Sequence, residues 1–157
     1  LPELLKVYPK LHYHCVGLPT QHNEFLKVAQ ALNVDGHVTF HGRVSDADLP
    51  SFLMSSAIFV MLSSATDTGD VEGFGIALIE ANYFGLPTIG ALGCGIEDAI
   101  DDFRSGRLIS YDNLDEFKAA IEDILSHREH YQSHAKVWAH QHSWQLIVKR
   151  YIKALDL

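Results

Sequence analysis

Short apolar segments alternate with helical patterns along most of this chain. The segments that read as strands are residues 11–16, 38–41, 58–62, 87–90 and 108–110. Residues 58–62 are apolar throughout, which is typical of a strand covered on both faces. Between the strands, apolar positions recur at helical spacing, near residues 21–32, 46–55, 74–84 and 114–125.

Polar residues mark where two of these helices begin. Ser45 with Asp48, and Asn113 with Glu116, have the three-residue spacing of a capping box. Pro50 is compatible with its helix because it falls near the first turn. The helix at 114–125 carries one apolar stripe, formed by Leu114, Phe117, Ile121, Ile124 and Leu125.

The two ends of the chain are also predicted to be helical. Residues 1–8 read as the end of a helix that leads into the strand at Leu11. After Ser143 apolar residues again repeat at helical spacing, and no strand pattern follows: Trp144, Ile147, Val148, Tyr151, Ile152 and Leu155. We therefore predict a final helix that docks back on the body of the domain.

This order of elements predicts the fold class. Strands that alternate with helices through right-handed crossovers give an α/β fold, a Rossmann-like, doubly wound parallel sheet with helices on both faces. The predicted fold ends in C-terminal helices. Ligands of such open sheets bind at the carboxyl ends of the strands.

Composition narrows the function. The 157 residues suffice for one domain, and 47% apolar with 20% charged residues is ordinary for a soluble globular chain. A net charge of −8 argues against a nucleic-acid partner, since phosphate-backbone binders collect Lys and Arg. There is no apolar run of membrane-spanning length and no signal-peptide pattern. Cys15 and Cys94 lack ligand spacing and read as reduced, partly buried thiols, which fits the cytoplasm.

The ten histidines raise the question of a metal site. His127, His130 and His134 share one face of a predicted helix. Zinc sites need tighter ligand spacing with supporting second-sphere contacts, and exposed histidines are common on helices. We therefore predict no metal site.

Two carboxylates in the stretch EGFGIALIEA, residues 72–81, are the strongest functional signal. Glu72 lies just outside a helix N-terminus, where the helix dipole favours its charge. Gly73 and Gly75 allow backbone amides to approach a ligand at the helix start. Glu80 lies within a helix of buried composition, and a buried carboxylate is costly without partners.

The eight-residue separation prevents the two acids from acting as a tight pair on one bond. They would instead hold separate parts of one elongated ligand, and a ribose diol would satisfy Glu80 with two hydroxyl donors. On spacing alone, Glu72 as a helix cap and Glu80 as the partner of an arginine remain equally good interpretations.

The segment resembles a known motif. Glu72, Gly73, Phe74, Gly75 and Glu80 resemble the E-x7-E motif of retaining glycosyltransferases with the GT-B fold, of the family 4 type, called glycosyl transferases group 1. This family includes bacterial mannosyl- and glucosyltransferases. Further similarity to its second, donor-binding domain extends over VTFHGRV (38–44), residues 49–62, EANYFGLPTIGALGCGIEDAI (80–100) and SGRLI (105–109).

The resemblance implies roles for the acidic segment. Glu80 is expected to hold the ribose of a nucleotide sugar. Glu72, the residue to which we assign catalysis, is expected to bind hydroxyls of the transferred sugar, together with Gly73 and the backbone of Phe74, Gly75 and Ile76.

It also implies roles for residues that follow other strands. Arg43 and Val44 match the place where backbone groups meet the nucleobase. Gly17 closes a strand in the same crevice, although the family more often continues with another glycine and this chain reads Gly17-Leu18-Pro19. Ser63 and Ser64 match the pocket wall, with a structural role as the alternative. Asp98 matches a family acid but reads as a structural helix residue, because Gly93-Cys94-Gly95 replaces the usual glycine pair.

The implied reaction moves a hexose, for example mannose or glucose, from a nucleoside diphosphate to a glycan or lipid acceptor with retention of configuration. No cofactor and no metal are expected, and no residue reads as a dedicated nucleophile. Polysaccharide or glycolipid synthesis in the cytoplasm, or peripherally at the cytoplasmic face of the membrane, is the expectation at the level of the family.

The resemblance further implies that residues 1–157 are one donor-binding domain of a longer enzyme. Its first strand, the Arg and Lys that grip the donor diphosphate, and the N-terminal acceptor domain are expected upstream. The chain alone is then expected to be inactive.

Other functions remain possible on the sequence. A GT-B-fold sugar-nucleotide epimerase would use the same crevice without an acceptor, and a non-catalytic module would only bind the nucleotide. A flavodoxin-type signalling domain fits less well, because Asp101 and Asp102 follow a predicted helix rather than strand ends.

Overall fold

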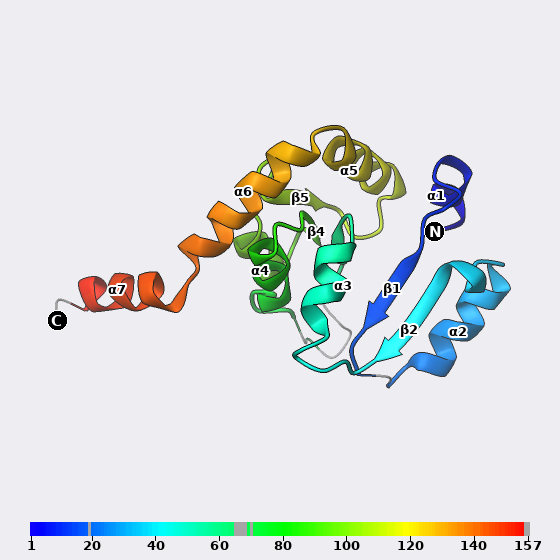
Figure 1. Ribbon diagram of the computed structural model, residues 1–157, viewed down its shortest axis with the longest axis horizontal. Coiled ribbons are helices and arrows are strands. Elements are labelled where there is room, and N and C mark those ends of the chain that lie inside the picture. Colours follow the sequence, from blue (N-terminus) through cyan, green and yellow to red (C-terminus); the bar gives the residue numbers. More distant parts are fainter. Residues whose placement is uncertain (19, 65–68, 70, 156–157) are drawn as a thin grey trace. The chain divides into compact units, whose positions relative to one another are not determined.

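The computed structural model describes residues 1–18, 20–64, 69 and 71–155. The chain divides into two compact units, Leu1–Leu49 and Pro50–Leu157. Each unit has its own parallel sheet, and the elements of both are drawn in Figure 1.

The first unit is built on two parallel strands. β1 (Tyr13–Val16) pairs with β2 (Val38–Gly42), and Cys15 lies opposite Phe40 in the register. The crossover between the strands contains α2 (His22–Ala31) and the short 3-10 helix η1 (Asp35–His37). α1 (Pro2–Val7) precedes β1. The buried apolar residues of this unit come from α1, α2 and the turn after α2: Leu4, Ala29 and Val34.

The second unit contains a three-stranded parallel sheet in the order β3-β4-β5. These strands are β3 (Phe59–Met61), β4 (Thr88–Ala91) and β5 (Gly106–Ile109). All four residues of β4 are buried, which is typical of a central strand covered on both faces.

The remaining described elements are helices. They are α3 (Leu49–Ser55), α4 (Ile76–Tyr83), η2 (Gly95–Ala99), α5 (Leu114–Ser126), α6 (Arg128–Gln141) and α7 (Trp144–Ala154). α4 packs against β3, β4 and α6, and α5 packs against β5 and α6 (Figure 1). An apolar cluster beneath α4 joins Leu78, Ile96, Ala99 and Ile100 to half-buried Phe59, Met61 and Phe74.

The predicted order of strands and helices is confirmed, and the ends differ for identifiable reasons. α4 begins at Ile76 rather than Phe74 because Gly75 adopts a left-handed backbone with φ of 80°. α3 begins at Leu49 because the residues before it form a turn, in which Asp48 N donates to Ser45 Oγ at 3.2 Å. Asn113 caps α5 as predicted, but the Glu116 carboxylate accepts from Ser110 N at 2.7 Å instead of completing a capping box.

The described strands pair as two parallel sheets, β1-β2 in the first unit and β3-β4-β5 in the second. The prediction that residues 58–62 form a strand covered on both faces is wrong. All three residues of β3, which pairs with β4, are only half-buried. The parallel α/β class with flanking helices is confirmed.

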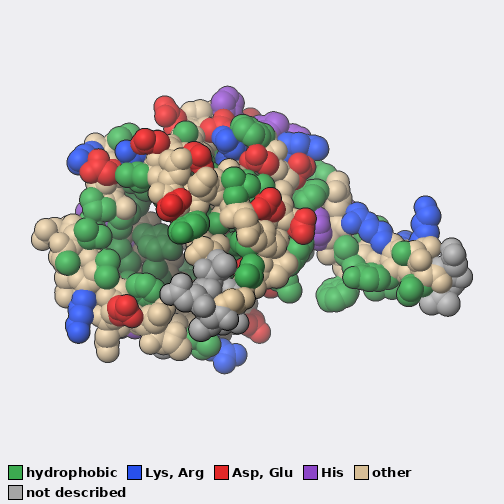
Figure 2. Space-filling view, turned by 180° about the vertical axis from the view of Figure 1, so that it is seen from behind, with side chains coloured by type: hydrophobic (Ala, Val, Ile, Leu, Met, Phe, Trp, Pro, Cys, Tyr) green, Lys and Arg blue, Asp and Glu red, His purple; other side chains and the backbone are tan. Residues whose placement is uncertain are grey.

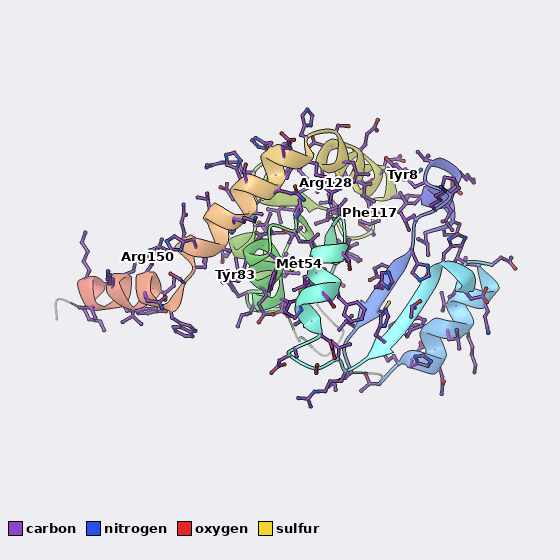
Figure 3. All side chains as sticks on the ribbon, in the orientation of Figure 1. Tyr8, Met54, Tyr83, Phe117, Arg128 and Arg150 are labelled. Atoms are coloured by element: carbon purple, nitrogen blue, oxygen red, sulfur yellow. The ribbon has the colours of Figure 1, made fainter. Side chains whose placement is uncertain are left out.

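The final helix forms but does not dock as predicted. α7 has no buried residue, and Trp144 at its start is 79% exposed. The apolar residues of α7 gather on one side and its Lys and Arg side chains on the other (Figure 2). Arg150, for example, is exposed on α7 (Figure 3). Amphipathic spacing therefore predicted the helix, but it did not predict what covers its apolar side.

Within the described part of the chain, no helix combines the length and the apolar character needed to cross a bilayer.

Candidate functional site

Glu72 lies in the turn that leads into α4, and its carboxylate bonds to that turn. Glu72 Oε1 accepts from the backbone N–H of Gly75 at 3.1 Å and from that of Phe74 at 3.4 Å, the second a long bond. The side chain thus satisfies two backbone donors of the turn just before α4, where the helix dipole also favours a negative charge. Oε2 takes part in neither bond. Glu72 therefore stabilises the turn that precedes α4 and does not cap the helix itself.

The two glycines of the turn have different reasons to be glycine. Gly75 is buried with a left-handed backbone, and a Cβ there would lie 2.9 Å from Leu78 Cδ1. At Gly73 a Cβ would meet no atom within 4 Å. Gly75 is therefore required by the local geometry, whereas the packing of the turn leaves space at Gly73.

Glu80 is exposed, which corrects the expectation of a carboxylate inside a buried helix. α4 buries Leu78 and Ala81 completely, whereas Ile76 and Tyr83 on the face of Glu80 are 68% and 70% exposed. Tyr83 is labelled on this helix in Figure 3. The apolar neighbours of Glu80 in sequence thus belong largely to other faces of the helix. Among the described residues, Glu80 has no hydrogen-bond or ion-pair partner, arginine included.

The turn after β4 contacts both sides of the loop that carries Glu72. Gly95 N donates to the Glu72 carbonyl oxygen at 2.9 Å, and Cys94 Sγ lies 3.5 Å from the Ser63 carbonyl oxygen. Ser63 is half-buried and Ser64 is exposed. Parallel β3 and β4 end at the same edge of the sheet, which brings these residues together. The predicted site did not include Gly95.

In the first unit, the predicted residues follow the ends of β1 and β2. Gly17 N donates to the Gly42 carbonyl oxygen at 3.0 Å. Arg43 comes next and is exposed, and Val44 is half-buried. A cavity of about 190 Å³ lies beside these strand ends and is lined in part by Gly17, His22, Phe25, Phe40 and Gly42.

The predicted site residues are thus divided between the units. Gly17, Arg43 and Val44 belong to Leu1–Leu49, and the remaining ones belong to Pro50–Leu157. Most of the polar loop after Ser64, at positions 65–68 and 70, lies outside the described residues.

The two cysteines are free and half-buried, as predicted. Burial raises the pKa of the Cys15 thiol, although a hydrogen bond with Tyr13 opposes the shift. Cys15 therefore remains protonated at neutral pH and is a weak nucleophile.

The histidines of α6 and the residue before it bond to protein groups. His127 Nδ1 lies 2.9 Å from Asp123 Oδ1, His130 Nε2 lies 3.1 Å from the Phe103 carbonyl oxygen, and His134 Nδ1 lies 2.8 Å from the His130 carbonyl oxygen. Across residues 1–155, apart from 19, 65–68 and 70, no group of three or more His, Cys, Asp or Glu side chains is placed to hold a metal ion.

The sequence as a whole matches a known family model. Residues 1–155 match the model for "Glycosyl transferases group 1". The chain belongs to this family. The resemblance of the E-x7-E segment is thereby confirmed at the level of the family, and the match extends over nearly all of the chain.

Two mannosyltransferases of Mycolicibacterium smegmatis are among its similar relatives. A GDP-mannose-dependent alpha-(1-6)-phosphatidylinositol monomannoside mannosyltransferase is 28% identical over 127 residues, which cover 80% of this chain and 33% of the relative. A phosphatidyl-myo-inositol mannosyltransferase is 27% identical over 159 residues, covering 99% of this chain and 39% of the relative. This group 1 chain therefore spans a third to two fifths of the length of these relatives.

Solved structures show the same fold. Anabaena Alr3699/HepE in complex with UDP has a TM-score of 0.74 at 19% identity, covering 94% of this chain and 41% of that one. The pneumococcal O-GlcNAc transferase GtfA in complex with UDP and GlcNAc has a TM-score of 0.74 at 20% identity. The match covers 99% of this chain and 31% of that one. The GT-B type of α/β fold predicted for this group 1 chain is confirmed.

Proposed function

We propose that this chain is the donor-binding part of a retaining glycosyltransferase that moves a hexose, for example mannose or glucose, from a nucleoside diphosphate to an acceptor. The arrangement at α4 is the observation that supports this most directly. Glu72 lies at the helix start and Glu80 lies on the exposed face of the same helix, so two separate acids are presented to one elongated ligand.

Glu80 is the proposed partner of the ribose. Its carboxylate is exposed, has no partner among the described residues, and offers two acceptor oxygens to a diol. Ile76 and Tyr83 extend the same face with large apolar surfaces that a bound nucleoside would cover.

Glu72 is the proposed partner of the transferred sugar. Oε1 is held by the backbone N–H groups of Phe74 and Gly75, so the orientation of the carboxylate is set before the donor arrives. Oε2 is then the atom that accepts from a sugar hydroxyl. Gly73 and the backbone of Ile76 complete this end of the site, and a group fixed in this way positions the ring for reaction.

The remaining predicted residues are assigned to the rest of the donor. Arg43 and Val44 would meet the nucleobase through their backbone, with Gly17 beside them after β1. Ser63 and Ser64, after β3, would form the wall of the pocket. These roles rest on their places in the family pattern and on the ends of the strands that carry them.

The main catalytic requirement is to stabilise charge on the departing diphosphate while the sugar is held in place. We propose that protein groups meet this requirement without a metal ion, because hard cations need clustered oxygen ligands. Binding of GDP-mannose or UDP-glucose should therefore be unchanged in excess EDTA. A loss of binding that a divalent ion restores would contradict this part of the proposal.

The relatives support a longer enzyme. The two mannosyltransferases are about two and a half to three times as long as the stretch that matches this chain, and their names specify phosphatidylinositol compounds. We propose that an acceptor domain and the diphosphate-binding strand belong to the same polypeptide as this chain. The acceptor is then a glycan or a lipid, and the enzyme works in the cytoplasm or peripherally at the cytoplasmic face of the membrane.

The test of this function is Glu72→Ala in the full-length enzyme. Turnover with a labelled nucleotide sugar should fall by about 100-fold or more, the order of loss when a reacting group is displaced by about 1 Å. Affinity for the bare nucleoside diphosphate should change less than about threefold, because Glu72 is not assigned any contact to the nucleotide. Equal losses in turnover and nucleotide affinity would contradict the assignment of Glu72 to the sugar.

A further inference from the structure

The turn that follows β4 approaches the Glu72 segment more closely than a side chain would allow. A Cβ on Gly95 would lie 2.0 Å from the carbonyl oxygen of Gly73 and 2.8 Å from that of Glu72. Real Cβ atoms do not approach backbone oxygens to 2.0 Å, and backbone cannot rotate aside as a flexible side chain can. Glycine at position 95 is therefore a condition for the observed position of the Glu72–Gly73 backbone.

The contact is also directional. Gly95 N donates to the Glu72 carbonyl oxygen at 2.9 Å, a normal length for a backbone hydrogen bond. Gly95 thus fixes the backbone of Glu72, while Phe74 N and Gly75 N fix its carboxylate. The acid is held from both sides, and Gly95 itself contributes no side chain to the site.

The turn has a rigid base. Ile96, the next residue, is fully buried and packs in the cluster that contains Leu78 of α4. A Cβ on Gly75 would lie 3.5 Å from Ile96 Cγ1, so Ile96 also lies directly beneath the start of α4. On the other side Cys94 Sγ reaches the Ser63 carbonyl oxygen at 3.5 Å. The turn therefore contacts both flanks of the loop between β3 and α4.

We propose that Gly95 is a positioning residue of the donor site, which acts through Glu72 and sets the place of its carboxylate relative to the transferred sugar. This inference rests on the proposed function of Glu72. Gly95 is expected to affect binding of the sugar and not of the nucleotide. Its contacts are to Glu72 and Gly73, and none is to Glu80.

The test is Gly95→Ala in the full-length enzyme, with GDP-mannose against GDP and UDP-glucose against UDP as paired probes. Turnover should fall about 100-fold, by analogy with displacements of about 1 Å at other sites. Affinity for the bare nucleotide should stay within about threefold, because the substitution changes no contact to the nucleotide. Gly106→Ala is the matched control, because its Cβ would lie 2.2 Å from the Thr88 carbonyl oxygen, in the β4–β5 pair. It should lose thermal stability and leave the ratio of sugar-nucleotide to nucleotide affinity unchanged.

A double-mutant cycle separates positioning from a general loss of structure. In a Glu72→Ala background, Gly95→Ala should lower turnover no further, because residues that act through one another are not additive. A second full loss in that background would overturn the proposal, and so would a Gly95→Ala enzyme that behaves like Gly106→Ala. Failure of the unsubstituted enzyme to bind any of the nucleotides would instead contradict the proposed function itself.

A milder pair of variants applies if Gly95→Ala does not fold. Ile96→Val and Ile109→Val each remove one methylene from a buried side chain. Ile96 is 0% exposed and Ile109 is 2% exposed. Both should fold with similar small losses of stability. Only Ile96→Val should lower turnover with a nucleotide sugar at unchanged nucleotide affinity. Equal turnover in the two variants would overturn the proposal.

Discussion

Three histidines meet on one face of the β1–β2 pair. His14 Nδ1 and His41 Nε2 lie 2.9 Å apart, and the ring of His12 is 4.8 Å from that of His14. His12 Nε2 in turn lies 2.8 Å from Thr39 Oγ1. A hydrogen bond between two imidazoles needs one neutral partner, so full protonation of this group is unfavourable. Burial, followed by the charges of His12 and His41, lowers the pKa of His14 below its ordinary value of 6.5.

The consequence is a loss of stability on acidification. A histidine whose pKa is lowered by folding binds fewer protons folded than unfolded, so stability falls as the pH drops below 6.5. The thermal unfolding temperature should therefore decrease between pH 7.5 and pH 5.5, a window that brackets the ordinary histidine pKa of about 6.5. His14→Asn should decrease less over this window than the unsubstituted protein or the control His140→Asn, which lies outside the cluster on α6. An equal decrease in all three would contradict this account of His14.

At the scale of single residues, the sequence predicted positions better than environments. Glu72 and Gly75 were identified by the motif, and both lie where a helix-start pattern places them. The exposure of Glu80 was missed because composition alone does not show which face of the helix is buried. Gly95 was missed because its contact joins segments more than twenty residues apart, and no local pattern encodes such a contact.

At the scale of elements, Asp123 joins β5, α5 and α6. Its Oδ2 accepts from Arg107 Nη1 at 2.6 Å and from the Tyr131 hydroxyl, and its Oδ1 lies 2.9 Å from His127 Nδ1. The Arg107 guanidinium also lies 3.8 Å above the centre of the Phe103 ring. Burial and the bond to Asp123 raise the pKa of Tyr131.

Tyr131→Phe tests this junction with little change of packing. Tyr131 is 2% exposed, and removal of its hydroxyl takes one donor from a charged acceptor. We expect a loss of about 1.5–3 kcal/mol in the free energy of unfolding, the usual range for a hydrogen bond to a charged group. Tyr111→Phe, at a residue that is 55% exposed, is the matched control and should leave the denaturation midpoint unchanged. A silent Tyr131→Phe would show that the junction contributes nothing to stability.

The two tryptophans test whether α7 packs on the second unit. Trp138 on α6 is half-buried and donates its indole N–H to the Ala99 carbonyl oxygen at 2.9 Å, whereas Trp144 on α7 is 79% exposed. Trp138→Ala should cost about 3 kcal/mol of unfolding free energy, the low end of the range for buried Trp→Ala changes, because the side chain is half-buried. Trp144→Ala should stay within about 0.5 kcal/mol, as at other exposed sites. Chemical denaturation of both variants of this chain decides the point, and a large loss at Trp144 would mean that α7 docks after all.

The elements could be predicted largely because their signals are local. Asn113 gave the start of α5, and the helical spacing after Ser143 gave α7. What α7 covers depends on partners that local periodicity does not specify. The structure accordingly agrees with the predicted order and type of the elements but shows a final helix without buried residues.

At the scale of the whole molecule, the family match over residues 1–155 and the parallel α/β fold agree. The predicted donor-site residues fall into both compact units, at or after the ends of strands and around the start of α4. Ligands of open parallel sheets bind at these strand ends. In the second unit, Glu80 on α4 is exposed and has no hydrogen-bond or ion-pair partner among the described residues.

Calorimetric titration of a nucleoside diphosphate into the full-length enzyme and its Glu80→Gln variant tests the central claim most directly. Glu122→Gln, at an exposed glutamate of α5, is the matched control. Because Glu80 is exposed, both variants should unfold at the same temperature as the unsubstituted enzyme. We predict that Glu80→Gln alone weakens nucleotide binding, by about 1.5–3 kcal/mol, the usual worth of hydrogen bonds to a charged group. Unchanged affinity in a well-folded Glu80→Gln enzyme would contradict the assignment of α4 to the donor nucleotide.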